Sequence, residues 1–150
     1  MTTNHADVDA LPQDVYAVLT DAYAYAKWVV GSKRVRGVDP NWPAVGARFH
    51  HTVGPPGVDI KDSSKLVELE ENRRVVLEVR FRPAGVAVVA IDLEPLEGGR
   101  RTHITMMEHP RSGPVRKWWS MPLEIATSAR NAISLRRLAR LCERRAHASV

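Results

Sequence analysis

The chain has 150 residues, of which 44% are hydrophobic and 26% are charged. This is the size and composition of one globular domain, so we expect a single domain over residues 1–150. The longest apolar run, Gly85–Ile91, is too short to cross a bilayer. The first residues also lack the basic segment followed by an apolar segment that is typical of a secretion signal. We therefore expect neither a membrane span nor a secretion signal. The only cysteine, Cys142, excludes an intramolecular disulfide and favours a reducing cytoplasm.

The net charge of +5 is concentrated in the C-terminal segment. Residues 1–110 hold 13 basic and 15 acidic side chains, whereas residues 111–150 hold nine basic and two acidic ones. Such a segment could contact nucleic acid or another anionic surface. We favour the simpler interpretation, in which the arginines form the solvated side of an amphipathic helix, and we expect no nucleic-acid partner.

Proline and glycine divide the N-terminal half into short elements. We expect a strand over Ala6–Leu11, a helix that begins at Pro12, and a second short helix over Ala22–Trp28 that Gly31 ends. Between Val35 and Val53, hydrophobic residues are interrupted by Pro and Gly turns, as in short strands.

From residue 60 onward the pattern is that of an antiparallel meander. Strand-length runs with short connectors cover Asp62–Glu70, Arg74–Arg82, Val86–Glu94 and Arg101–His109. Short connectors favour antiparallel neighbours. Apolar and polar residues alternate in the middle two runs, so we expect one buried and one solvated face.

After Pro110 the hydrophobic period changes to that of a long helix. Its predicted apolar side consists of Met121, Ile125, Ala132, Leu135, Leu138, Ala139 and Cys142. The opposite side carries Arg130, Arg137, Arg140 and Arg144. We expect the apolar side to pack on the sheet and the helix to begin, or to kink, near Pro122.

This order of elements, together with several short motifs, resembles the START-like (SRPBCC) superfamily of helix-grip proteins, in particular its polyketide cyclase/dehydrase-like branch. The motifs are PQDVYAVLTD at 12–21, YAKW at 25–28, DPNWPAVG at 39–46, THITMME at 102–108 and RNAISLRRL at 130–138. The resemblance implies an α+β helix-grip fold, in which a curved antiparallel sheet of about seven strands wraps a long C-terminal helix. It also implies a cavity between them that in other members holds lipids, sterols, hormones or aromatic polyketides.

The resemblance provides no universal catalytic motif, because some members cyclise or dehydrate polyketides and many others only bind a ligand. The function that we expect is binding of a small hydrophobic or aromatic metabolite. The alternative is a polyketide cyclase or dehydratase with one acid–base group in the pocket. We expect no cofactor.

Two residues are candidates for that acid–base group. Alternation places Glu108 on the side of its strand that faces the helix, where a carboxylate would be costly unless it is paired or protonated. It could act as a general acid or base, or it could form an ion pair with an arginine such as Arg111 or Arg116. His51 shares the side of Phe49 in its strand and is the weaker candidate.

The predicted pocket lining combines these two residues with aromatic and polar neighbours. Its members are Trp28, Phe49, His51, Met106, Glu108, Trp118 and Asn131. Aromatic rings suit a flat apolar ligand, and Asn131 could orient a ligand carbonyl. An exposed Trp118-Trp119 pair, or a free sheet edge, would instead favour a homodimer.

The histidines do not predict a metal site. His50 and His51 are adjacent in a strand and so point to opposite faces, while His103 and His109 lie about 20 Å apart along theirs. Cys142 lies on the apolar side of the helix, where a thiol is packed and unreactive.

Overall fold

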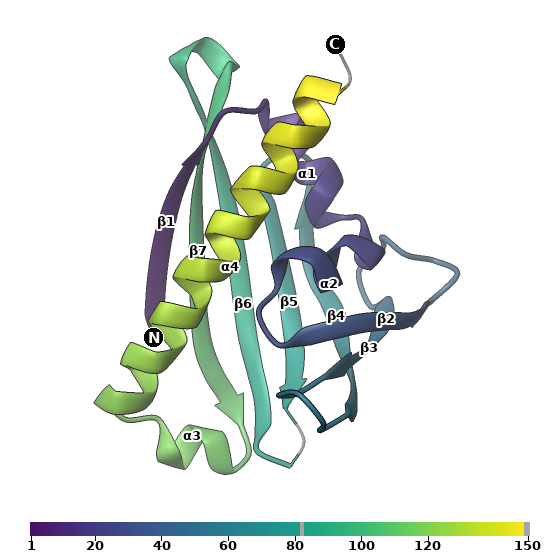
Figure 1. Cartoon of the computed structure of the whole chain (residues 1–150), viewed down its shortest axis with the longest axis vertical. Helices are drawn as coiled ribbons and strands as arrows, with labels where there is room; N and C mark the ends of the chain where they lie inside the picture. Colours follow the sequence, from purple (N-terminus) through teal and green to yellow (C-terminus); the bar gives the residue numbers. More distant parts are fainter. Residues whose placement is uncertain (82, 149–150) are drawn as a thin grey trace.

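The computed structural model describes residues 1–81 and 83–148. Its main feature is a seven-stranded antiparallel sheet with the strand order β1-β7-β6-β5-β4-β3-β2 (Figure 1). The strands are β1 (Thr2–Val8), β2 (Ser32–Val38), β3 (Arg48–Val53), β4 (Ile60–Glu70), β5 (Arg74–Phe81), β6 (Gly85–Leu96) and β7 (Arg101–Ser112). From β2 to β7 each strand pairs with the next one in sequence, which confirms the predicted meander.

Helices cover one face of this sheet. They are α1 (Pro12–Leu19), α2 (Tyr25–Trp28), α3 (Pro114–Trp118) and α4 (Met121–Ala148), with 3-10 turns at Ala22–Ala24 and Glu97–Gly99. The long helix α4 runs diagonally across the sheet, and α1 and α2 lie beside its C-terminal half (Figure 1). This is the predicted α+β helix-grip arrangement. No helix in the described part of the chain is long and apolar enough to cross a membrane.

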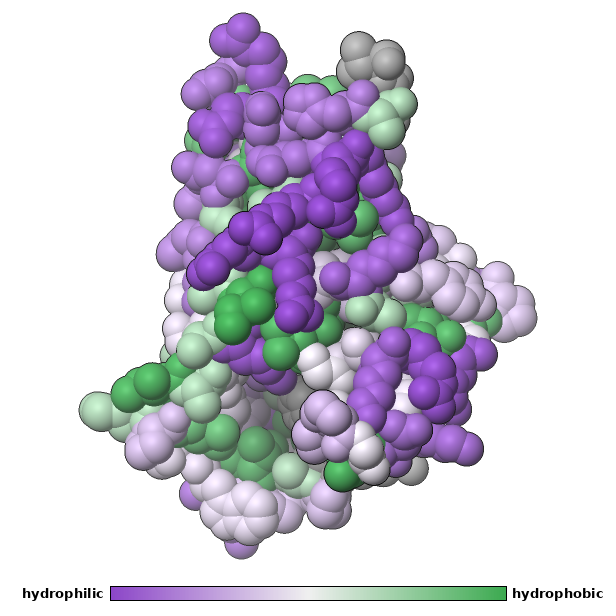
Figure 2. All heavy atoms as spheres, viewed as in Figure 1, coloured by the Kyte–Doolittle hydropathy of each residue, from purple (hydrophilic) through white to green (hydrophobic). Residues whose placement is uncertain are grey.

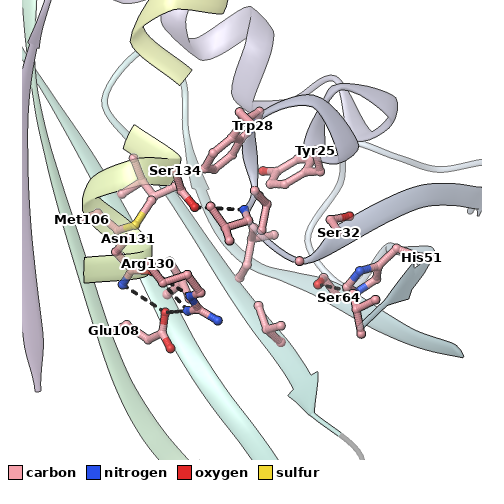
Figure 3. Close-up of a pocket in the computed structure, with 18 of the residues that line it drawn as sticks. Tyr25, Trp28, Ser32, His51, Ser64, Met106, Glu108, Arg130, Asn131 and Ser134 are labelled. Atoms are coloured by element: carbon pink, nitrogen blue, oxygen red, sulfur yellow. Dashed lines mark hydrogen bonds and ion pairs between the residues drawn. The ribbon is translucent and has the colours of Figure 1, made fainter. Parts of the chain in front are cut away.

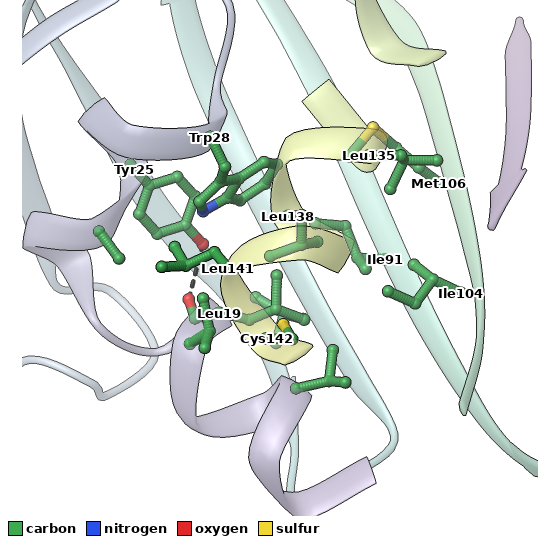
Figure 4. Close-up of a cluster of buried hydrophobic side chains, with 14 of the residues drawn as sticks. Leu19, Tyr25, Trp28, Ile91, Ile104, Met106, Leu135, Leu138, Leu141 and Cys142 are labelled. Atoms are coloured by element: carbon green, nitrogen blue, oxygen red, sulfur yellow. Dashed lines mark hydrogen bonds between the residues drawn. The ribbon is translucent and has the colours of Figure 1, made fainter. Parts of the chain in front are cut away.

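The hydrophobic core lies between the sheet and the C-terminal half of α4 (Figure 4). Inward side chains of the central strands, such as Val75, Ile91 and Ile104, are fully buried there. On the helix side they meet Leu135 and Leu138, which are 1% and 0% exposed. Burial of each such side chain stabilises the fold by roughly 1.5–3 kcal/mol.

The buried face of α4 changes in character along the helix. Over its C-terminal half this face is apolar, with Leu138, Leu141 and Cys142. Over its N-terminal half the buried residues are polar, and they are Thr127, Asn131 and Ser134. Buried polar groups need hydrogen-bond partners or a polar ligand. The N-terminal half of α4 is therefore the candidate location of a ligand-binding site.

The buried face of α4 is also rotated from the predicted one. Met121 and Ile125 were predicted to face the sheet, but they are 74% and 65% exposed. The first turns of α4 lie at the lower edge of the sheet, next to α3, so the sheet does not cover these side chains (Figure 1). Hydrophobic periodicity therefore predicted the helix correctly but placed the contact face too far toward Met121 and Ile125.

The predicted boundaries of the first strand were wrong. The sequence favoured Ala6–Leu11, whereas β1 covers Thr2–Val8. The first residues of this strand are mostly polar, so the sequence pattern does not indicate a strand there. The strand forms because Thr2 to Val8 pair antiparallel with Glu108 to Thr102 of β7. Pairing also lengthens β7, which continues past the predicted end at His109 as far as Ser112.

Candidate functional site

A cavity of about 340 Å³ lies under the N-terminal half of α4 (Figure 3). Its floor is apolar and comes from alternate residues of the central strands, namely Leu77, Val79, Val89, Ile91 and Met106. The face of the molecule that carries α4 is hollowed below the middle of this helix (Figure 2). Polar side chains gather on two sides of the cavity rather than on its floor (Figure 3).

Aromatic rings from α2 and β3 form one wall of the cavity. Tyr25, Trp28 and Phe49 all line it, and they are 3%, 2% and 2% exposed. The Tyr25 ring stacks on Phe49 with a centroid distance of 4.7 Å and lies 5.0 Å from the Trp28 ring. The Tyr25 hydroxyl donates to the main-chain oxygen of Leu19 at 2.7 Å, and burial raises the pKa of this hydroxyl. The wall is therefore rigid and uncharged, which suits a flat apolar ligand.

A charged cluster on α4 and β7 forms one polar side of the cavity. The Glu108 carboxylate, which is 3% exposed, accepts a hydrogen bond from Arg130 Nη2 at 2.7 Å and another from Asn131 Nδ2 at 3.2 Å. Both bonds reach the same oxygen, Oε1. Asn131 Oδ1 in turn accepts from Arg130 Nη2 at 3.1 Å. This network neutralises a carboxylate that would otherwise be costly to bury.

The predicted alternative for Glu108, an ion pair with an arginine, is present, but the partner is Arg130 and neither of the suggested residues, Arg111 and Arg116. Arg130 itself was wrongly predicted on the solvated side of the helix. Because the buried face of α4 is rotated, Arg130 lies at its border and reaches into the cavity (Figure 3). Arg111 instead forms an ion pair with Glu78 on the outer face of the sheet.

His51, Ser32 and Ser64 form the second polar side (Figure 3). Ser64 Oγ lies 3.3 Å from His51 Nε2, while Ser32 Oγ and His51 Nδ1 have no hydrogen-bond partner among the described residues. Burial lowers the pKa of His51, although the nearby Asp62 carboxylate acts in the opposite direction. At neutral pH the imidazole is therefore uncharged and can exchange hydrogen bonds with a ligand.

Six of the seven predicted lining residues border this cavity: Trp28, Phe49, His51, Met106, Glu108 and Asn131. Their contact with a ligand stays a prediction. The seventh, Trp118, was placed wrongly, because it belongs to α3, is 65% exposed and lies outside the lining. Tyr25, Ser32, Ser64 and Arg130 also line the cavity, and they were not among the predicted lining residues. Of these only Tyr25 had a signal, its helical spacing from Trp28.

A pair of histidines on the other face of the sheet was also missed. His5 lies in β1 and stacks on His103 of β7 with a centroid distance of 5.2 Å. The Asp7 carboxylate lies 2.6 Å from His103 Nδ1. Within residues 1–81 and 83–148 no group of three or more potential ligand side chains has the geometry of a metal site.

The fold and its cavity define an α+β helix-grip protein with an internal, mainly apolar cavity. The family described as polyketide cyclase / dehydrase and lipid transport matches residues 2–143. The chain therefore belongs to this family. No curated protein matches the chain in sequence.

Solved structures share the fold at low sequence identity. Protein NE0264 from Nitrosomonas europaea is 21% identical, with a TM-score of 0.73 over 95% of this chain and 94% of that one. The Aha1 dimer from Colwellia psychrerythraea is 16% identical, with a TM-score of 0.68 over 95% of each chain. DynU16, from the dynemicin biosynthetic locus, is 17% identical, with a TM-score of 0.67 over 93% of this chain and 45% of that one.

Proposed function

We propose that this protein binds a small hydrophobic or aromatic metabolite in the cavity between the sheet and α4. The observation that carries the proposal is a cavity of about 340 Å³ with an apolar floor, an aromatic wall, and the buried atoms Ser32 Oγ and His51 Nδ1, which have no hydrogen-bond partner among the described residues. Small-molecule sites typically have volumes of roughly 300–1,000 Å³ and this kind of lining. Membership of a polyketide cyclase and lipid transport family supports the same proposal.

The polar atoms constrain what the ligand must carry. Ser32 Oγ and His51 Nδ1 are buried and find no hydrogen-bond partner in the described part of the chain, and each such atom costs about 1–3 kcal/mol. A ligand hydroxyl or carbonyl placed at this side would remove that cost. An apolar body of one or two rings would then lie over Val89 and against Trp28.

A blocking substitution with a matched control tests the proposal. Val89 lines the cavity, whereas the preceding residue, Val88, does not. We expect Val89→Phe to fill the cavity and Val88→Phe to leave it open, since successive residues of a strand face opposite sides. Mass spectrometry of organic extracts should find a small molecule that co-purifies with the wild type and Val88→Phe but not with Val89→Phe. Equal recovery of that molecule from all three proteins would contradict the proposal.

Catalysis is the second candidate function, and the position of His51 favours it. An uncharged imidazole that lines the cavity can accept a proton from a ligand. Glu108 lines the same cavity, but Arg130 and Asn131 already occupy its Oε1. In a polyketide cyclase or dehydratase, we therefore assign the role of general base to His51 and a positioning role to Glu108.

Substitution of both residues separates binding from turnover. If the protein is an enzyme, His51→Asn should reduce turnover of a polyketide substrate about 100-fold or more while the ligand still binds. Glu108→Gln should mainly change the affinity. Unchanged turnover in His51→Asn would exclude His51 as the base and would leave the binding proposal untouched.

A further inference from the structure

A second depression, of about 320 Å³, lies on the outer face of the sheet, the face that α4 does not cover. It is lined by Arg36, Arg48, His50, Lys61, Asp62, Ser63 and Arg80. Strand pairing brings these residues together: His50 is opposite Ser63, and Arg80 follows Val79, which is opposite Ser64. Four successive strands, β2 to β5, contribute to it, so the chain must be folded to form it.

The depression gathers more cationic side chains than the nearby carboxylates, which are Asp62 in its lining and Asp39 beside His50. Arg36, Arg48, Lys61 and Arg80 form no ion pair with any residue within 1–81 and 83–148. Asp62 also lines the depression, but it is 2% exposed and its Oδ1 accepts the amide of Ser63 at 3.0 Å. The cationic side chains therefore outnumber the acidic ones.

Other arginines on the outer face of the same sheet are paired. Arg74 contacts Asp92 at 2.6 Å and Glu68 at 3.0 Å, and Arg111 pairs with Glu78. An ordinary solvated basic face would mix both signs in this way throughout. Among the residues that the structure describes, the arginines and the lysine of the depression therefore lack the ion pairs that these other arginines form, whereas His50 pairs with Asp39 at 3.3 Å.

Hydrogen bonds to neutral groups hold two of these guanidinium groups in place. Arg36 Nη2 donates to the main-chain oxygens of His51 and Asp62, each at 3.2 Å. Arg48 Nη1 donates to Ser63 Oγ at 3.4 Å, and Ser63 is 7% exposed. These contacts fix the position of the charges without cancelling them, which prepares a site for an anion.

We propose that this outer depression binds the linked phosphates of a small diphosphate ligand. Guanidinium groups recognise phosphate oxygens in pairs, and Arg36, Arg48 and Arg80 offer several such donors around one hollow. The buried Ser63 hydroxyl can donate its proton to a phosphate oxygen at the base of the site. The site is distinct from the cavity under α4, although Arg80 borders both.

Calorimetric titration with inorganic pyrophosphate and with a nucleoside diphosphate, at a constant ionic strength of about 0.15 M, tests the site. The double variant Arg36→Gln/Arg48→Gln removes two charges from the depression at positions that do not line the cavity under α4. Arg137→Gln/Arg140→Gln removes the same charge from the exposed side of α4. We expect the first variant to bind at least about 10-fold more weakly and the second to stay within about 2-fold of the wild type.

Several outcomes would overturn the proposal. They are no binding of either diphosphate by the wild type, equal weakening in both variants, and binding of double-stranded DNA alone. Equal weakening would mean nonspecific attraction to net charge. Thermal melting of both variants must first confirm that they remain folded. Binding of one or both diphosphates that only Arg36→Gln/Arg48→Gln weakens would support the site.

Discussion

Glu108 shows how one buried carboxylate is tolerated beside an apolar cavity. It is 3% exposed, and its ion-pair partner Arg130 keeps about a third of its side chain in solvent at 33% exposure. The pair therefore sits at the border between protein and water. The carboxylate is desolvated, whereas the guanidinium keeps contact with water. Removal of the arginine should therefore destabilise the protein more than removal of the glutamate, because it leaves a buried charge unpaired.

We predict that Arg130→Met destabilises the protein by about 2 kcal/mol, less than a fully buried pair would lose, because the guanidinium is partly solvated. The double variant Glu108→Gln/Arg130→Met should be more stable than Arg130→Met, since it removes the unpaired charge. Urea unfolding measures both values. Arg137→Met, on the exposed side of the same helix, is the control and should change stability by less than about 0.5 kcal/mol. A double variant less stable than Arg130→Met would contradict this account.

His51 makes stability depend on pH in a defined direction. Burial lowers its pKa below the ordinary value of 6.5, so the unfolded chain takes up a proton at a higher pH than the folded protein does. Its contribution to stability is therefore complete above about pH 6.5 and is lost as the pH falls toward the folded pKa.

Thermal melting between pH 7.5 and 5.5 checks this prediction. The wild type should lose more stability over this interval than His51→Asn does. His109→Asn, which changes an exposed histidine, should keep the slope of the wild type. The neighbouring charged groups Asp62 and Arg36 remain in all three proteins, so the comparison isolates the imidazole. Equal slopes in the wild type and His51→Asn would contradict the prediction.

At the scale of elements, α4 performs two tasks with its two halves. Its C-terminal half closes the core with Leu138 and Leu141, and its N-terminal half roofs the cavity with Asn131 and Ser134. Ser134 Oγ accepts the main-chain amide of Val30 at 3.0 Å and so fixes the helix to the segment after α2. The cavity persists because these roof residues are short and polar and do not fill it.

We predict that Leu138→Ala destabilises the protein by about 3 kcal/mol, because this fully buried side chain would leave a void in the core. Urea denaturation provides the measurement. Arg137 directly precedes Leu138 and lies on the exposed side of the helix. Arg137→Ala should change the free energy of unfolding by less than about 0.5 kcal/mol. Similar losses in both variants would mean that α4 packs in another orientation.

At the scale of the whole molecule, exposed apolar residues gather at the end where α3 meets α4. Trp118, Met121 and Ile125 are 65%, 74% and 65% exposed, and green side chains mark this corner in Figure 2. Monomeric proteins rarely expose large contiguous apolar patches. We therefore predict a homodimer that covers this corner.

Native mass spectrometry gives the oligomeric state directly. The wild type should be a dimer, and Trp118→Ser/Ile125→Ser should shift it to the monomer. Leu11→Ser changes an exposed apolar residue of the loop between β1 and α1, and it should leave the dimer intact. A monomeric wild type would contradict the prediction.

The sequence by itself determined the order of elements, the antiparallel meander and the presence of the long C-terminal helix. Alternation also predicted that Glu108 and Met106 lie on the inner face of their strand, and both line the cavity. These features depend on local periodicity and on turns, which neighbouring residues encode. The motif resemblance led to the correct family for the same reason, because its residues belong to those elements.

Only the tertiary structure decided the rotation of α4, the partner of Glu108 and the charge of the outer depression. Periodicity does not distinguish a sheet-facing methionine at the start of α4 from an exposed one, so Met121 was misplaced and Arg130 was overlooked. Arg36, His50 and Arg80 lie far apart in the sequence and meet only through strand register. Contacts between distant segments depend on how the sheet curves and where the helix crosses it, and no local pattern encodes them.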